Sequence, residues 1–298
     1  MSFTVTVVGM GAMGLPMATN LAKNFTVRGV DIAQPRLDLA KAAGIETFTN
    51  AADAAEGADV VLLAVRNEAQ LLDALFGDGD IASHMTPGAV VLLTSTVGIG
   101  AVENAAKRLK EIGLNIVDAP VSGGPVRAGE GDLLVTAGAE PTVVEQIRPV
   151  LEEMASKLVI VGDAPGKGQA LKTVNQLLCG VHIAAAGEAL ALADRLGLDP
   201  AAALDALMSG AASSFMLGDR GQRMLEAYDG DGAEVKSRLD IFVKDMGIVT
   251  AAAKKAGIGV PLAAAAEQQY LAGLVRGQGA MDDSSIIRIV APAKAQDA

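Results

Sequence analysis

A glycine-rich turn stands near the start of the chain. Residues 5–14, V-T-V-V-G-M-G-A-M-G, join an apolar run to G-x-G-x-x-G, and apolar residues then recur at helical spacing. A strand, this turn and a helix together are the context that the dinucleotide fingerprint requires. Gly9 permits the tight turn, Gly11 lets the backbone approach a pyrophosphate, and Gly14 lets the helix pack closely on the strand. The helix N-terminus favours phosphate. We therefore predict that a dinucleotide is bound by Gly9, Met10, Gly11, Ala12, Met13 and Gly14, although a chance glycine turn is the alternative.

Asp31 follows the next apolar run, residues 26–30. A carboxylate at this position can accept hydrogen bonds from the adenosine ribose and would repel a 2′-phosphate. We expect Arg28 to point away from the strand end and Arg36 to lie about one turn into the next helix. Asp31 and Ile32 are therefore predicted to contact the cofactor, which should be NAD rather than NADP. The alternative is that Asp31 only caps the following helix.

The first half of the chain alternates strand-like and helical patterns. Strand-like runs lie near residues 3–9, 26–31, 59–65, 89–94, 114–118, 132–137 and 157–161. Helical patterns lie between them, for example at 35–43 and 100–112. Several strands are continuous apolar runs, which are typical of a parallel sheet covered on both faces. The pattern predicts an α/β fold, with a Rossmann-type, doubly wound, mostly parallel sheet in residues 1–164.

The pattern changes after residues 162–166, and no further clear strand follows. Helices are predicted near 167–196, 200–209, 213–227, 236–256, 261–276 and 284–290. We predict that residues 165–298 form an all-helical C-terminal domain for substrate binding and oligomerisation. Such a helical half packs poorly alone, so a homodimer or homotetramer is expected.

Composition and charge exclude several classes of function. A formal net charge of −11 disfavours nucleic acids and anionic membrane surfaces as partners. The single cysteine, Cys179, allows no internal disulfide, and no C-x-x-C or C-x-x-H spacing indicates a metal site. No basic segment precedes the first strand, and the apolar run at 183–192 contains Glu188 and is too short to cross a bilayer. We therefore expect a cytoplasmic protein.

Hydride transfer to a dinucleotide needs a group that exchanges the hydroxyl proton. His84 lies in a predicted surface turn and His182 in the long apolar helix, so both are better explained as structural residues. Lys172 lies near the start of that helix, with Gln176 on the same face and Asn175 beside it. A lysine with amide neighbours in an interdomain cleft could hold a carboxylate-bearing substrate and exchange a proton. The alternative is a solvated surface lysine.

Two loops follow predicted strands, where ligands bind in open α/β sheets. The loop at residues 118–125 contains Ser122, Gly123 and Gly124, whose hydroxyl and N–H groups suit a substrate carboxylate. An ordinary glycine turn is the alternative. The Thr-Ser-Thr segment at 94–96 could meet the cofactor ribose or nicotinamide amide, or could cap a helix.

Four motifs in order carry a resemblance to a known family. They are G-M-G-A-M-G at the start, D-A-P-V-S-G-G at 118–124, G-x-G-x-x-x-K-x-x-N at 166–175 and D-I-F-V-K-D at 240–245. The chain resembles the β-hydroxyacid dehydrogenase family over nearly its whole length. That family includes 3-hydroxyisobutyrate dehydrogenase and tartronate semialdehyde reductase.

The resemblance implies a role for each matching residue. Lys172 would be the catalytic acid/base, and Ser122 and Gly123 would bind the substrate carboxylate. Thr96 and Lys244 would contact the nicotinamide end of the cofactor. The other predicted contacts are Val65, Arg66 and Asn67 for the cofactor, and Gly124, Asn175 and Gln176 for the substrate.

One position departs from the family pattern, because Gln176 stands where many members carry Asn. Residues 175–184, 240–247 and 282–285 look most similar to the L-threonate dehydrogenase branch, although Phe215 replaces a Trp associated with it.

The resemblance implies NAD-dependent oxidation of L-threonate or a similar C3–C5 hydroxy acid. A 3-hydroxyisobutyrate dehydrogenase, or a tartronate or succinic semialdehyde reductase, is the alternative. A non-catalytic NAD-binding scaffold is a further alternative, and an imine reductase is disfavoured by the lysine.

Overall fold

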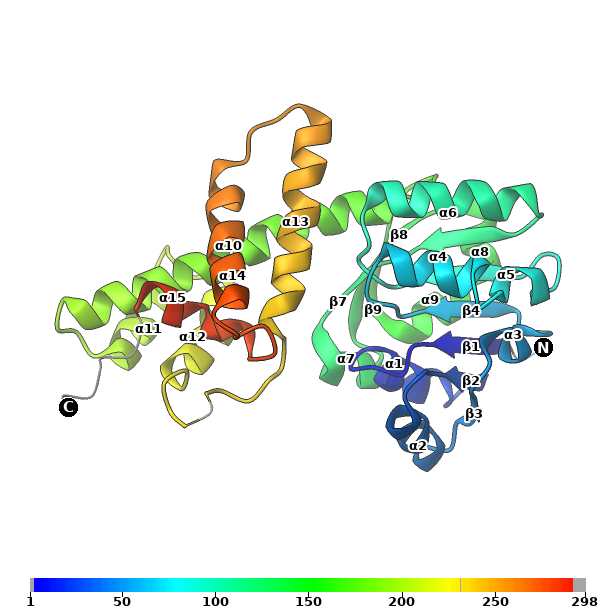
Figure 1. Ribbon diagram of the computed structural model, residues 1–298, viewed down its shortest axis with the longest axis horizontal. Helices are drawn as coiled ribbons and strands as arrows, with labels where there is room; N and C mark the ends of the chain where they lie inside the picture. Colours follow the sequence, from blue (N-terminus) through cyan, green and yellow to red (C-terminus); the bar gives the residue numbers. More distant parts are fainter. Residues whose placement is uncertain (1–2, 231, 292–298) are drawn as a thin grey trace. The chain divides into compact units, whose positions relative to one another are not determined.

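The computed structural model describes residues 3–230 and 232–291 of the chain. The chain forms two compact units, Met1–Lys172 and Thr173–Ala298 (Figure 1). The first unit contains the sheet and the second contains helices, as the alternation of patterns predicted.

A nine-stranded sheet organises the described part of the first unit. Its strands are β1 (Thr4–Val8), β2 (Thr26–Val30), β3 (Glu46–Phe48), β4 (Val60–Leu63), β5 (Val90–Leu93), β6 (Asn115–Asp118), β7 (Val121–Ser122), β8 (Leu133–Gly138) and β9 (Ala155–Gly162). The strands from β1 to β6 are parallel and lie in the order β3-β2-β1-β4-β5-β6. Strand β8 is antiparallel to β6 and β7 and parallel to β9. The predicted Rossmann-type, mostly parallel sheet is confirmed.

Both faces of the sheet are apolar because successive side chains of each strand point to opposite sides. Val60 and Leu62 of β4 pack into one core, while Val61 and Leu63 pack into the other. The first core is covered by α1 (Gly14–Leu21), α2 (Gln34–Ala42), α7 (Gly124–Glu130), α8 (Pro141–Gln146) and α9 (Arg148–Met154). The second is covered by α3 (Ala51–Ala55), α4 (Glu68–Phe76), α5 (Ile81–His84) and α6 (Ile99–Glu111). In Figure 1, α4 and α6 lie on the opposite side of the strands from α1 and α7.

Two short strands were not predicted from the sequence. Strand β3 has three residues and β7 has two, which is too few to show an alternating pattern. Both exist because a neighbouring strand pairs with them, β2 with β3 and β8 with β7. Strand β7 lies within the loop at 118–125, for which the sequence predicted a role in binding the substrate carboxylate.

The second unit is helical. Helix α10 (Lys167–Arg195) begins in the first unit and continues into the second, where α11 (Pro200–Met208), α12 (Phe215–Leu225), α13 (Leu239–Ala256), α14 (Pro261–Val275), the 3-10 helix η1 (Asp283–Ile286) and α15 (Ile287–Val290) follow. Helices α13 and α14 form an antiparallel pair (Figure 1). Phe242 of α13 stacks on the buried Tyr270 of α14 at 5.3 Å between ring centroids, and the Tyr270 hydroxyl donates to the Gly180 carbonyl. These contacts tie both helices to α10.

Helix α10 has the length predicted for it, and the apolar run at 183–192 is only part of it. By length and composition it is the one helix, among the described residues, that could cross a membrane. However, 56% of its most apolar stretch is buried in the structure. A core helix of a globular protein has the same properties, so length and composition do not assign α10 to a membrane.

Candidate active site

Each of the three glycines of the fingerprint has a different structural reason. Gly9 has a φ of +96°, and a Cβ atom there would lie 2.5 Å from the Ala64 carbonyl oxygen. A Cβ at Gly14 would lie 1.7 Å from the Gly9 oxygen, so the packing of α1 on the sheet excludes a side chain. A Cβ at Gly11 would meet nothing within 4 Å. The protein itself therefore leaves space at Gly11, as a bound pyrophosphate requires.

The N-terminus of α1 also suits a phosphate. Its N-cap residue, Met13, makes no side-chain cap, and the first turn contains no acidic residue. The uncapped N–H groups and the helix dipole therefore favour an anion. Ala12 is exposed in the same turn, whereas the Met10 side chain is buried in the core. Met10 can thus meet a ligand only through its backbone.

The Asp31 carboxylate is held in place from two sides. One oxygen accepts the Met10 N–H at 2.7 Å and the other accepts the Ala33 N–H at 2.8 Å. The N-cap residue of α2 is Ala33, so Asp31 steadies the turn without being the helix cap itself. The neighbouring Ile32 is 101% exposed, which leaves an apolar surface that an adenine ring could cover.

The basic residues near Asp31 lie as expected. The Arg28 guanidinium donates to the carbonyls of Ala54 and Glu56 and is therefore turned away from the strand end. Arg36 lies in the first turn of α2. The residues therefore fit an adenosine ribose without a 2′-phosphate.

The ends of β4 and β5 carry the next predicted contacts. Asn67 caps α4 by accepting the Gln70 N–H at 2.9 Å, and Arg66 donates its N–H to the Gln70 side chain. Val65, which precedes Arg66, and Thr96, which follows β5, are both partly buried. The N-cap of α6 is Gly98 and makes no side-chain cap, so the helix-cap alternative for residues 94–96 is wrong.

A buried aspartate not predicted as a site residue ends β6. One oxygen of Asp118 accepts the N–H groups of Gly166 and Gln169 at 3.0 and 2.8 Å. The other accepts the Gln169 side-chain amide at 2.9 Å. Burial raises the pKa of Asp118 to about 6, and the hydrogen bonds from Gln169 and Gly166 oppose that rise.

Lys172 lies on the next turn of α10 and is 9% exposed. Its ammonium donates to the Val121 carbonyl at 2.9 Å and to the Ser122 hydroxyl at 2.8 Å. The alternative of a solvated surface lysine is therefore wrong. Gly123 and Gly124 have φ values of +146° and +78°, so the turn itself requires glycine, while a Cβ at Gly124 would face open space. Lys172, Ser122 and this open turn lie together in the first unit.

The remaining predicted residues form a chain of polar contacts in the second unit. The Asn175 amide donates to Gln176 Oε1 at 2.8 Å, and Gln176 Nε2 donates to Asp245 at 2.5 Å. The Lys244 ammonium donates to the other oxygen of Asp245 at 2.6 Å. Asp245 is buried and was not predicted from the sequence, although it belongs to the D-I-F-V-K-D motif. Gln176 is therefore engaged with Asp245.

The two histidines take no part in either group. The His84 ring lies 3.0 Å from the Asp80 carbonyl and is exposed, and His182 is exposed on α10. The structural interpretation of both residues agrees with these positions.

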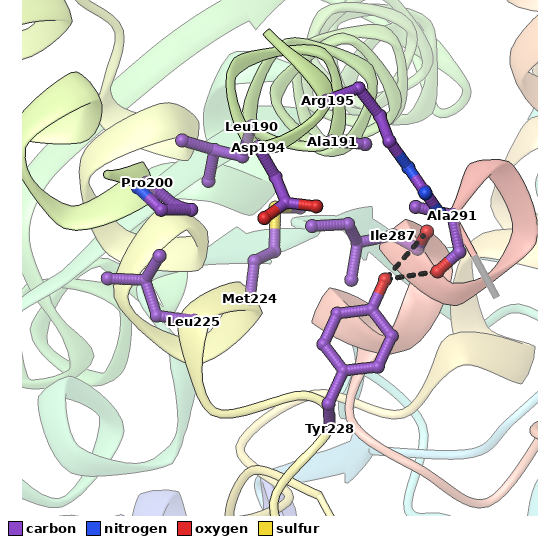
Figure 2. A pocket seen from close by; sticks show the side chains of 10 residues that line it. All are labelled: Leu190, Ala191, Asp194, Arg195, Pro200, Met224, Leu225, Tyr228, Ile287 and Ala291. Carbon is purple, nitrogen blue, oxygen red and sulfur yellow. Dashed lines mark hydrogen bonds between the residues drawn. The ribbon is translucent and has the colours of Figure 1, made fainter. Parts of the chain in front are cut away.

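A cavity of about 310 Å³ lies in the second unit, apart from the predicted residues (Figure 2). Its lining is mostly apolar and includes Leu190, Met224, Leu225 and Ile287. Figure 2 shows the Tyr228 hydroxyl directed at the carbonyls of Ile287 and Ala291, to which it donates. None of the predicted catalytic or cofactor residues lines it.

The fingerprint, the buried lysine and the fold define a nicotinamide-dependent oxidoreductase. Residues 4–162 match the NAD-binding domain of 6-phosphogluconate dehydrogenase, and residues 166–290 match the NAD-binding domain of NADP-dependent 3-hydroxyisobutyrate dehydrogenase. The chain belongs to the β-hydroxyacid dehydrogenase family. The predicted family, its enzyme class and a nicotinamide cofactor are thereby confirmed.

Relatives and solved structures agree with this assignment. L-threonate dehydrogenases of Escherichia coli O6:H1 and Cupriavidus necator are each 38% identical to this chain, over 96% and 97% of it and 94% and 96% of their own lengths. The crystal structure of 3-hydroxyisobutyrate dehydrogenase from Salmonella typhimurium is 36% identical and superposes with a TM-score of 0.88, covering 97% of this chain and 100% of that one. The similarity therefore extends through both units.

Proposed function

We propose that this protein oxidises L-threonate, or a closely similar small hydroxy acid, with NAD. The observation that carries the proposal is the buried Lys172 ammonium, held at 2.9 Å from the Val121 carbonyl and 2.8 Å from the Ser122 hydroxyl. A buried amine beside a hydroxyl and an open glycine turn suits proton exchange with a bound alcohol. The relatives named L-threonate dehydrogenase support the choice of substrate.

The residues divide the chemistry between them. Ser122 and the N–H groups of Gly123 and Gly124 would hold the substrate carboxylate. The bound nicotinamide would supply the hydride acceptor. Lys172 in its neutral form would take the hydroxyl proton as the carbonyl forms, and would later release that proton to solvent. The reverse reaction would use the same ammonium as the acid.

Contacts to the nicotinamide end are proposed for Thr96, Asn67 and Lys244, following the family resemblance. The ion pair with Asp245 would hold the Lys244 ammonium in one orientation. Because Gln176 donates to the same Asp245, we assign Gln176 to supporting Lys244 rather than to reaching a substrate hydroxyl. Asn175 then remains the amide proposed for the substrate.

The choice of NAD over NADP rests on Asp31. Its carboxylate is fixed by the N–H groups of Met10 and Ala33, and Arg28 is engaged elsewhere. A 2′-phosphate would meet a fixed negative charge there. A strong preference for NADP in steady-state kinetics would contradict this assignment.

A substrate screen tests the function. Purified protein is incubated with L-threonate, 3-hydroxyisobutyrate or 4-hydroxybutyrate and either NAD or NADP, or with tartronate semialdehyde and either NADH or NADPH, and nicotinamide absorbance is followed. We expect the highest kcat/KM with L-threonate and NAD. Faster turnover of a semialdehyde would favour a reductase, and tight NAD binding without any turnover would favour a scaffold.

We further propose a homodimer or homotetramer in the cytoplasm. Apolar side chains stay exposed on the second unit, including Val174, Leu178 and Leu192 of α10. Exposed apolar side chains at helical spacing are typical of surfaces buried between subunits.

A further inference from the structure

Two buried polar side chains of the first unit, Asp118 and Gln169, have no role in the chemistry proposed above. Both are fully buried. The Gln169 amide uses both of its ends. Its oxygen accepts the N–H groups of Val97 and Gly98 at 3.0 Å each, and its nitrogen donates to the Ser95 carbonyl and to Asp118 at 2.9 Å each. An amide side chain supplies both the acceptor and the donor groups, whereas an ionised carboxylate has no donor and a thioether sulfur is only a weak acceptor.

These bonds bracket Thr96. The Ser95 carbonyl and the Val97 N–H lie on either side of Thr96, and both bond to Gln169. The backbone that carries the proposed nicotinamide contact is therefore held by one side chain from the first turn of α10.

Asp118 holds the same turn from the other side. Its carboxylate accepts the N–H groups of Gly166 and Gln169, so it caps α10 from a distant strand. A Cβ at Gly168 would lie 2.4 Å from the Asp118 carbonyl oxygen, so glycine is needed for the helix to approach this closely. Lys172 follows Gln169 by one turn of the same helix.

We propose that the Asp118–Gln169 pair is a positioning element, which sets the spacing between Thr96 and the Lys172 ammonium. The pair would act without touching substrate or cofactor, through the backbone of residues 95–98, which follows β5, and through the start of α10. This inference rests on the proposed function, which gives Thr96 and Lys172 their roles.

Two substitutions at Gln169 test the pair. Gln169→Glu places an oxygen against the Ser95 carbonyl and the Asp118 carboxylate, whereas Gln169→Met keeps the length and removes the hydrogen bonds. Asn20→Asp is the matched control, because Asn20 is also a buried amide, on α1, and donates to the Glu153 carbonyl at 2.7 Å. We expect kcat to fall roughly 10²-fold in both Gln169 variants. The Kd for NAD should stay near the wild-type value, and Asn20→Asp should keep its kcat.

A second measurement does not depend on turnover. The side-chain resonance of Lys172 is followed by NMR in protein containing carbon-13-labelled lysine, and is assigned by its loss in Lys172→Arg. We expect it to shift in both Gln169 variants and to stay in place in Asn20→Asp. If Gln169→Glu does not fold, Gln169→Met alone provides the comparison.

The outcomes separate the inference from the function. Folded Gln169 variants with an unchanged Lys172 resonance and an unchanged kcat would overturn the positioning role. If the wild type turns over no hydroxy acid, the proposed function fails, and the Lys172 resonance then decides whether Gln169 positions that side chain.

Discussion

Two lysines near the start of α10 have different surroundings. Lys167 is exposed, whereas the Lys172 ammonium is buried against Val121 and Ser122. We expect Lys172→Ala to lower kcat by ~10²–10⁴-fold, because a placed proton-exchanging group is lost. NAD binding, measured by fluorescence titration, should be unchanged, and Lys167→Ala should keep full activity. An active Lys172→Ala enzyme would remove Lys172 from the mechanism.

A second prediction at the residue scale concerns the effect of Gln176 substitutions on the free energy of unfolding. Gln176→Asn is one methylene shorter and should lose the bond to the buried Asp245 carboxylate, which costs about 1–3 kcal/mol of unfolding free energy. Gln176→Glu should cost more at neutral pH than at acidic pH, because it places a second carboxylate beside Asp245. Urea unfolding at two pH values measures both effects. Equal stability of the wild type and Gln176→Asn would show that the Asp245 contact is energetically neutral.

At the scale of elements, substitutions at two glycines near the turn between β1 and α1 should have different effects, one on NAD binding and the other on stability. Gly11→Ala adds a methyl group where nothing lies within 4 Å, so the unfolding free energy should change little. The same methyl group would occupy the pyrophosphate position, and the Kd for NAD should rise about 10- to 100-fold, corresponding to about 1–3 kcal/mol of overlap.

Gly14→Ala should have the opposite effect, a loss of stability. Its methyl group would overlap the Gly9 oxygen at 1.7 Å, so the variant should lose about 3 kcal/mol or more of stability. Calorimetric unfolding and NAD titration of both variants test the contrast. Similar losses of stability in the two variants would refute it.

The junction of β6 and α10 should make stability depend on pH. Burial raises the pKa of Asp118 from 3.8 to about 6, so the folded state binds the proton more tightly than the unfolded state does. The contribution of Asp118 to the unfolding free energy should therefore fall as pH rises from about 4 to about 6, by up to about 3 kcal/mol. The Asp118→Asn variant has no titrating group at this position, so its unfolding free energy should lack this dependence on pH. Parallel stability curves for the two proteins between these pH values would contradict the prediction.

At the scale of the whole molecule, exposed apolar side chains predict self-association. Leu192 lies on α10, Leu196 is the first residue after the end of α10, and both side chains are exposed. A Leu192→Glu/Leu196→Glu variant should shift sedimentation toward smaller species, because charged groups would be buried at the subunit contact. Ile112→Glu, at an exposed apolar position of the first unit, is the control and should leave the sedimentation unchanged. A wild-type protein that sediments as a monomer would contradict the proposal.

Local signals predicted the framework of the fold well. The fingerprint at residues 9–14, Asp31 after β2 and the long helix α10 were all expected within a few residues of their observed positions. The strands β3 and β7 were missed, because they depend on pairing rather than on their own pattern. The roles of the catalytic and binding residues remain predictions.

The sequence alone determined the alternation of the longer strands and helices and the dinucleotide fingerprint, because periodicity and glycine spacing record local backbone conformation. Four motifs in order carried the resemblance to the family. Only the tertiary structure decided which polar groups are paired. Asp118 and Gln169 are 51 residues apart, and Gln176 and Asp245 are 69 residues apart, yet each pair shares a buried hydrogen bond. No local pattern encodes such a bond, since its partners meet only when distant segments are packed together.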